Sequence, residues 1–315
     1  MLTIPFRRSL LAAILTSSLM FNVQAVTADE PTLGQTASIP AGKIQSIALR
    51  PDGGPSLAVA LASIAQWRIA PGASVVLRLA DGTYRQTGTV NIEHPDGSRI
   101  QIVGNTEAPG NVRLIWAAQT DGLYVGAGQV LGRLDGVTLS RDIPGGNDNG
   151  ATDNATGLLA ENAGVLRAGP AVVVDGFYYG AQARYGGVLR LRGTTVRHAG
   201  DAGYFAYNGG HIDAQQAKAE DVSDSKLGLG SGFVAEYGGT IDATGAKSTR
   251  NALAGFTALS NGSIVANGAS ATENRRFGFY AITNGSIVAH YPSLAKNAVN
   301  ATHSAQGGSI SGLEP

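Results

Sequence analysis

Apolar and polar residues alternate with a period of two through much of the second half of the chain, in short runs that end at Gly or Asn. In the segment that starts at Gly255, Phe256 and Ala258 are expected to face one way, and Thr257 and Leu259 the other. An amphipathic helix would repeat its apolar positions with a period of about 3.6 residues instead. The alternation therefore predicts short β-strands with one buried face.

This pattern returns about every 23 residues, as GFTALSNGSIVANGASATENRRF from Gly255 is followed by GFYAITNGSIVAHYPSLAKNAV from Gly278. An apolar residue stands nine positions after each of the eight repeat starts, at Leu131, Leu166, Leu189, Ile212, Ile241, Ile264, Ile287 and Ile310. A single repeat cannot bury its apolar face, whereas stacked repeats can. We therefore predict a parallel β-helix with coils of about 23 residues, each built from three short strands.

Residues at equivalent positions of successive repeats allow further predictions. An amide ladder is predicted at one corner, from Asn251, Asn274 and Asn297. Ile264 is expected to stack between two other Ile residues in the core, and Thr257 is expected to be exposed and to tolerate Ala. Leucine-rich repeats share the period, but their L-x-x-L-x-L-x-x-N pattern is absent. Calcium-binding nonapeptide repeats and left-handed hexapeptide repeats do not fit either.

The N-terminal residues are typical of an export signal. Arg7 and Arg8 precede the apolar run LLAAILTSSLMF, and small residues follow at Val23 and Ala25. We predict a signal peptide at 1–25 and a periplasmic or secreted protein, with a retained anchor as the alternative. An irregular leader is expected at 26–54, ahead of a β-helix domain at 55–315. The stretch SLAVALASIAQW, with Ser56 as N-cap, predicts a helix that covers the open end of the β-helix.

Composition narrows the classes of partner. The formal net charge is zero, so no basic surface favours nucleic acid or anionic lipid, and no later segment is apolar enough to span a membrane. Without Cys, the exported protein cannot depend on disulfides for stability. The repeat is compatible with a monomer or a homotrimer.

The succession of helix, LADGTY, RIQIVGN and Gly-rich coils resembles the right-handed parallel β-helix proteins of the pectin-lyase-like superfamily. The resemblance covers the chain from about residue 50 to its end. It implies a right-handed coil, and it leaves activity open because that superfamily includes polysaccharide lyases, glycoside hydrolases, epimerases, phage tailspikes and non-catalytic surface proteins. No catalytic motif of one family is present to be carried over.

Two insertions, at 143–154 and within 221–232, interrupt the repeat at the same corner and are expected to wall a groove over the strand that follows them. Aromatic and charged residues gather on the outward positions of that strand and at its corners. The candidate catalytic residues are Arg184, Tyr185, His198 and Tyr207. The candidate substrate-binding residues are Tyr178, Tyr179, Asp201, Phe205, Glu161 and Glu236.

This combination is typical of a sugar site, in which ring faces cover C–H patches and charged groups bind hydroxyls or carboxylates. A lyase for uronate-containing polysaccharide needs a cation for the carboxylate and a base for the α proton. Arg184 suits the first role, and His198, Tyr185 or Tyr207 the second. A glycoside hydrolase is the second enzymatic choice, with Asp213 and Asp242 as its carboxylates on adjacent coils.

Three alternatives remain at this point. The groove residues also fit an ordinary amphipathic exterior, or a non-catalytic β-helix that binds glycan or forms a surface element. The column Arg167, Arg190, Asp213 and Asp242 fits a solvated charge ladder. No cofactor is expected, although the acidic segment NDNGATDN leaves Ca²⁺ possible in spite of its irregular ligand spacing.

Overall fold

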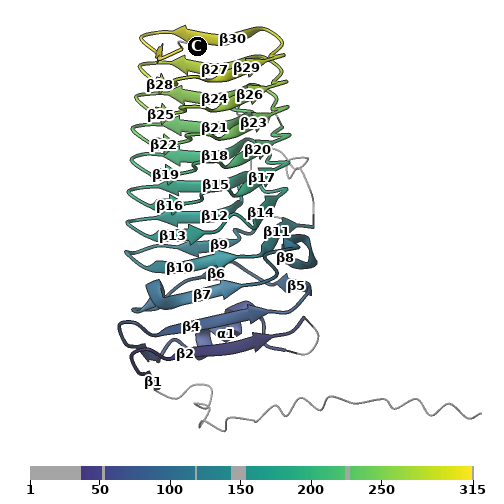
Figure 1. The fold of residues 1–315 in the computed structure, drawn as a ribbon, viewed down its shortest axis with the longest axis vertical. Helices are drawn as coiled ribbons and strands as arrows, with labels where there is room; N and C mark the ends of the chain where they lie inside the picture. Colours follow the sequence, from purple (N-terminus) through teal and green to yellow (C-terminus); the bar gives the residue numbers. More distant parts are fainter. Residues whose placement is uncertain (1–36, 52–53, 118, 143–153, 224–227, 314–315) are drawn as a thin grey trace, which may run out of the picture. The chain divides into compact units, whose positions relative to one another are not determined.

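The computed structural model describes residues 37–51, 54–117, 119–142, 154–223 and 228–313. These described residues form one compact unit, in which successive coils stack on one another (Figure 1). Each regular coil supplies one strand to each of three sheets, and the pairings within these sheets are parallel. The fold is a right-handed parallel β-helix, as predicted. The expected signal peptide lies outside the described residues.

Eleven strands form the first sheet, called sheet I. In spatial order they are β2 (Ile44–Leu49), β4 (Ser74–Leu79), β7 (Ile100–Val103), β10 (Val130–Asp135), β13 (Val165–Ala168), β16 (Val188–Arg190), β19 (His211–Asp213), β22 (Thr240–Asp242), β25 (Ser263–Val265), β28 (Ser286–Val288) and β31 (Ser309–Ser311). Strand β2 already belongs to this sheet, so regular structure begins inside the segment expected to be an irregular leader.

Nine strands form sheet II. They are β5 (Gly82–Gln86), β8 (Val112–Trp116), β11 (Val137–Arg141), β14 (Val172–Asp175), β17 (Thr195–Arg197), β20 (Lys218–Glu220), β23 (Lys247–Thr249), β26 (Ser270–Thr272) and β29 (Ser293–Ala295).

Sheet III also has nine strands, and most of them are longer than their neighbours in the coil. They are β6 (Val90–Asn91), β9 (Leu123–Val125), β12 (Thr156–Glu161), β15 (Tyr179–Arg184), β18 (Ala202–Tyr207), β21 (Ser231–Glu236), β24 (Ala254–Leu259), β27 (Phe277–Ile282) and β30 (Asn300–Ala305).

Short elements complete the N-terminal end. Strands β1 (Ser38–Ile39) and β3 (Arg68–Ile69) pair with each other, and two 3-10 helices lie at Gly97–Arg99 and Pro109–Asn111. Helix α1 (Leu57–Ser63) begins where predicted, because the Ser56 hydroxyl accepts a hydrogen bond from the N–H of Val59 (3.2 Å). Its apolar face joins the core at this end of the stack. Among the described residues, no helix has the length and apolarity needed to cross a bilayer.

The core consists of like residues stacked from coil to coil. Ile264 pairs in register with Ile241 and Ile287, and all three are buried. Inside sheet III the rings of Tyr204, Phe233, Phe256 and Phe279 follow one another at centroid distances of 4.7, 4.8 and 5.3 Å. The repeated Gly is needed where coils approach most closely: a Cβ on Gly262 would lie 2.0 Å from the carbonyl oxygen of Ala235.

The predicted Asn ladder is confirmed. The side-chain N–H of Asn251 donates to Oδ1 of Asn274, and Asn274 donates in turn to Oδ1 of Asn297, each at 2.9 Å. Each Oδ1 also accepts the backbone N–H of the Asn one coil earlier, at 3.1 Å. The ladder therefore supplies hydrogen bonds to buried polar groups at a corner, where the residues are not paired in a β-sheet.

The expectation for Thr257 was wrong. Its side chain points outward from sheet III as predicted, but only 1% of the residue is exposed, and its hydroxyl bonds to that of Ser231 at 2.8 Å. The reason is a second apolar cluster on the outer face of sheet III. Ala202, Phe205 and Val234 form it, and Leu229 and other side chains cover it.

Candidate functional site

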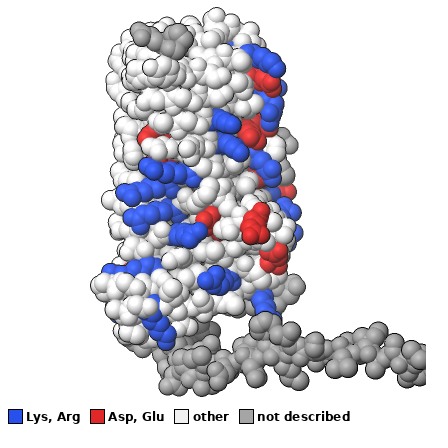
Figure 2. Space-filling view, in the orientation of Figure 1, with Lys and Arg blue, Asp and Glu red and all other residues white. Residues whose placement is uncertain are grey.

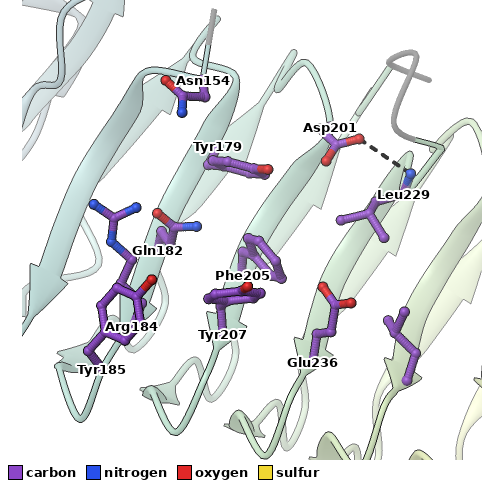
Figure 3. A pocket seen from close by; sticks show the side chains of 11 residues that line it. Asn154, Tyr179, Gln182, Arg184, Tyr185, Asp201, Phe205, Tyr207, Leu229 and Glu236 are labelled. Carbon is purple, nitrogen blue, oxygen red and sulfur yellow. Dashed lines mark hydrogen bonds between the residues drawn. The ribbon is translucent and has the colours of Figure 1, made fainter. Parts of the chain in front are cut away.

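A hollow of about 490 Å³ lies on the outer face of sheet III, at the middle of the stack (Figure 3). Its floor comes from β15, β18, β21 and β24. Its lining residues are Asn154, Tyr179, Gln182, Arg184, Tyr185, Asp201, Phe205, Tyr207, Leu229, Glu236 and Leu259. Asn154 and Leu229 are the described flanks of the two insertions, whose central residues, 143–153 and 224–227, lie outside the described residues.

Strand register places four charged or polar side chains in one column along this hollow. Glu161, Arg184, Tyr207 and Glu236 are successive partners in the parallel ladder of β12, β15, β18 and β21. Neighbouring strands are about 4.8 Å apart. Arg184 and Glu236 therefore stand two coils apart, with the Tyr207 ring between them.

Arg184 is held in place by its neighbours on the preceding coils. Its Nε donates to Oε2 of Glu161 (2.6 Å), and the guanidinium lies 5.7 Å from the ring centroid of Tyr185. Glu161 also accepts a hydrogen bond from the hydroxyl of Tyr124, through Oε1 at 2.8 Å. The Nε of Arg184 is thus used to orient the guanidinium group. Its terminal nitrogens can donate hydrogen bonds to a ligand.

Asp201 and Glu236 are the acidic residues of the hollow. Asp201 is buried, and its Oδ1 accepts the N–H of Leu229 at 3.3 Å (Figure 3), which ties the second insertion to β18. Burial raises the pKa of the Glu236 carboxyl, and the charge of Asp201 raises this pKa further. Glu236 is therefore the carboxylate of the hollow that takes up a proton more readily than an ordinary Glu.

Two tyrosines of the hollow, Tyr179 and Tyr207, have a raised pKa and stay protonated at neutral pH. Burial raises the pKa of Tyr179, and the charge of Asp201 adds to the effect. Burial also raises the pKa of Tyr207, and Tyr185 and Glu236 contribute in the same direction. Each phenol is therefore a hydrogen-bond donor rather than a ready base.

Most of the residues predicted for the site do meet in the hollow: Tyr179, Arg184, Tyr185, Asp201, Phe205, Tyr207 and Glu236. Glu161 lies next to it and orients Arg184. Tyr178 is only 1% exposed and packs edge-on against Tyr179, with ring centroids 4.6 Å apart, so it supports the hollow from below.

His198 does not reach the hollow. It occupies the turn after β17, and its Nδ1 lies 2.8 Å from Oδ1 of Asp175, whose other oxygen accepts from Arg197 Nε at 3.0 Å. The residue has a left-handed backbone (φ 51°), which directs the side chain along the corner toward the preceding coil. A role for His198 as the base in the groove is therefore not supported.

The carboxylates considered for a hydrolase stand on sheet I, away from the aromatic residues. Asp213 and Asp242 are register partners, as expected. Arg192 Nε donates to Asp213 (2.8 Å), and Asp242 accepts from the side chain of Gln215. Both carboxylates therefore already have side-chain partners, which come from the turns that follow β16 and β19.

Several lining residues were not assigned to the site from the sequence. Gln182 and Leu259 occupy outward positions of their strands, so the alternation in the sequence could have indicated that they line the groove. Asn154 and Leu229 fall outside the repeat, and no periodicity indicates their positions. In the part of the chain that the structure describes, no group of three or more His, Asp and Glu residues is placed to hold a metal ion. Of the segment NDNGATDN (147–154), for which Ca²⁺ was considered, all residues except Asn154 lie outside the described residues.

Comparisons with protein-family models, curated proteins and solved structures gave no match to this chain. The class of protein is therefore defined by architecture: the chain is a repeat protein of the right-handed parallel β-helix type, with a hollow of aromatic and charged residues on the outer face of one sheet.

Proposed function

We propose that this is an exported carbohydrate-active protein that binds and depolymerises an acidic, uronate-containing polysaccharide in the hollow on sheet III. The observation that carries the proposal is the column Arg184, Tyr207 and Glu236, flanked by the accessible rings of Tyr179 and Tyr185. Ring faces suit the C–H surfaces of sugars, and Arg suits a carboxylate. The sequence resemblance to the pectin-lyase-like superfamily and the predicted signal peptide point the same way.

The reaction that fits these groups is β-elimination. Terminal nitrogens of Arg184 pair with the uronate carboxylate and make the proton α to it more acidic. Glu236, a stronger base than an ordinary Glu because of its raised pKa, takes that proton. The bond from the β carbon to the glycosidic oxygen breaks as the C=C bond forms, and the Tyr207 hydroxyl donates a proton to the leaving oxygen. Tyr207 then recovers its proton from Glu236, through water.

The test is to incubate the protein with a panel of uronate polysaccharides and follow the ultraviolet absorbance of the unsaturated product. Wild type is expected to release product, whereas Glu236→Gln and Arg184→Gln are expected to lose at least about a hundredfold in rate. Glu107→Gln is the matched control, because Glu107 is exposed and lies outside the hollow. Absence of product from wild type across the panel would count against a lyase.

The runner-up is a glycan-binding protein without turnover, and it is favoured by two exposed tyrosines, one in the lining of the hollow and one next to it. Tyr185 and Tyr237 are 49% and 54% exposed and flank Tyr207 edge-on, at centroid distances of 6.4 and 5.5 Å. Such a row suits stacking on sugar rings. Saturable binding to a glycan array without product, unaffected by Glu236→Gln, would favour this function over the lyase.

A further inference from the structure

A group of arginines stands on the outer face of sheet I, separate from the hollow on sheet III. Arg167 on β13 and Arg190 on β16 are direct register partners, so their backbones are about 4.8 Å apart. Arg192 follows β16, and Asp213 is the register partner of Arg190 on the next coil. Figure 2 shows basic side chains gathered at mid-height of the stack on this side.

The single carboxylate among them is already engaged. Asp213 accepts a hydrogen bond from Arg192 Nε through Oδ2 at 2.8 Å. Arg133, on the coil before Arg167, is paired with the carboxylate of Asp135 at 2.7 Å. Within the described residues, neither Arg167 nor Arg190 has a carboxylate in ion-pair distance. Two arginines therefore stand in register on adjacent strands, and the carboxylate nearest to them in the sheet is paired with Arg192.

Like charges directly opposite each other in a sheet are destabilising. Here they are concentrated in a chain whose formal net charge is zero and in which only 15% of the residues are charged. A hollow of about 370 Å³ lies among these side chains, lined by Arg167, Ala168, Arg190, Arg192 and Asp213. It is large enough for a tetrahedral oxyanion and several waters, since a water occupies roughly 30 Å³ in the liquid.

We propose that Arg167 and Arg190 form an anion site that binds a sulfate or phosphate group between their guanidinium groups. Planar guanidinium groups donate paired hydrogen bonds to such oxyanions, and the negative charge removes the repulsion between the two side chains. Arg192 is held by Asp213 at the edge of the same hollow, so the site keeps a net positive charge after that pair is counted. This inference does not rest on the function proposed for sheet III.

The experiment is thermal unfolding with sodium sulfate or sodium phosphate titrated at constant ionic strength against sodium chloride. The variants are R167Q/R190Q and, as the matched control, R78Q. Arg78 lies on the same sheet, is exposed and has Ala48 and Val103 as register partners. Wild type and R78Q are expected to show a saturable rise of the unfolding midpoint. In R167Q/R190Q the apparent affinity should be at least about tenfold weaker, because charge-assisted hydrogen bonds are lost.

Each outcome decides the proposal. If charge and tetrahedral shape are enough for binding, sulfate and phosphate should raise the unfolding midpoint equally. A rise with only one of the two anions would identify the group that the site binds. Equal midpoint shifts in all three proteins would show a general salt effect and overturn the site. Without added anion and at low salt, R190Q should be at least as stable as wild type, because one of the two repelling charges is gone. A clearly lower midpoint for R190Q would overturn the charge argument.

Discussion

At the scale of single residues, Glu236 links the ionisation of the groove to the stability of the fold. Its pKa is raised in the folded protein by burial and by Asp201, above the ordinary value of 4.5. The ionised side chain therefore costs stability above the folded pKa, and the cost disappears below 4.5, where both folded and unfolded states are protonated. We predict that Glu236→Gln is more stable than wild type at neutral pH.

Denaturant titrations across pH check this prediction. The advantage of Glu236→Gln should shrink as the pH falls through the folded pKa, and vanish below 4.5. Glu107→Gln, at an exposed position, should match wild type throughout. A stability difference that does not change with pH would mean that the two side chains differ in packing rather than in charge.

Thr257 shows how an outward position can still be part of a core. Alternation predicted its direction correctly, but its exposure depends on Leu229 and the external cluster, which no repeat encodes. We predict that Thr257→Ala costs about 1–2 kcal/mol of unfolding free energy, because the Ser231 hydroxyl loses a buried partner. Thr83→Ala, at an exposed position on β5, should stay within about 0.5 kcal/mol. Equal losses in the two variants would rule out the special role of the Ser231–Thr257 contact.

At the scale of strands, stability rests on the stacked Ile column of sheet I. Ile264 on β25 lies between Ile241 and Ile287, and the flanking strands are held by ladders on both sides. A cavity there cannot easily collapse, so Ile264→Ala is predicted to cost about 2–5 kcal/mol. Val265 points outward from the same strand and is partly exposed, so Val265→Ala should cost less than about 1 kcal/mol. Urea titrations measure both, and a larger loss for Val265→Ala would reverse the inward and outward assignment.

The repeat made the strand positions and the Asn column at one corner predictable, and other corner positions much less so. The Ile and Asn columns could be predicted because each copy specifies the same environment. The position just before the Asn column, at the corner after sheet II, is different, because its residues adopt left-handed backbones in which side chains leave the alternation. His198, Asp221, Arg250, Glu273 and Lys296 all occupy this corner with φ between 51° and 59°. Arg250 pairs with Asp221 at 2.7 Å and Lys296 with Glu273 at 3.5 Å, so His198 shares this corner with ion-paired side chains and lies outside the hollow.

At the scale of the whole β-helix, the position of the groove followed from the two insertions, because both enter sheet III from the same corner. The contacts that build the side of the groove could not be predicted from the sequence. Leu229 packs against the external cluster and donates its N–H to Asp201, and Tyr124 reaches Glu161 from the coil before it. These two contacts join residues that are 28 and 37 positions apart in the sequence. Neither separation equals the repeat length of about 23 residues. Periodicity could therefore predict the groove and its floor but not the wall.

The axis of the stack also sets the direction in which a polymer would lie. Tyr185, Tyr207 and Tyr237 come from successive coils and form a row along the axis, in which Tyr185 and Tyr207 line the hollow and Tyr237 lies beyond its lining. A long glycan that follows this row should reach Tyr237, whereas a short oligosaccharide in the hollow should not. Tyr237→Ala is therefore predicted to weaken binding of long chains about three- to tenfold, as expected for the loss of one aromatic contact, and to leave short ones unchanged.

Tyr291→Ala is the matched control for this prediction. Tyr291 is also exposed, by 73%, and has the same left-handed backbone as Tyr237, with φ of 55° against 48°. It precedes β29 of sheet II and does not belong to the row. Any backbone effect of replacing Tyr by Ala should therefore be shared by both variants, while the loss of affinity for long chains should appear in Tyr237→Ala alone. Calorimetric titration with oligosaccharides of increasing length measures this difference. An equal loss for short and long chains would mean that the glycan does not run along the axis.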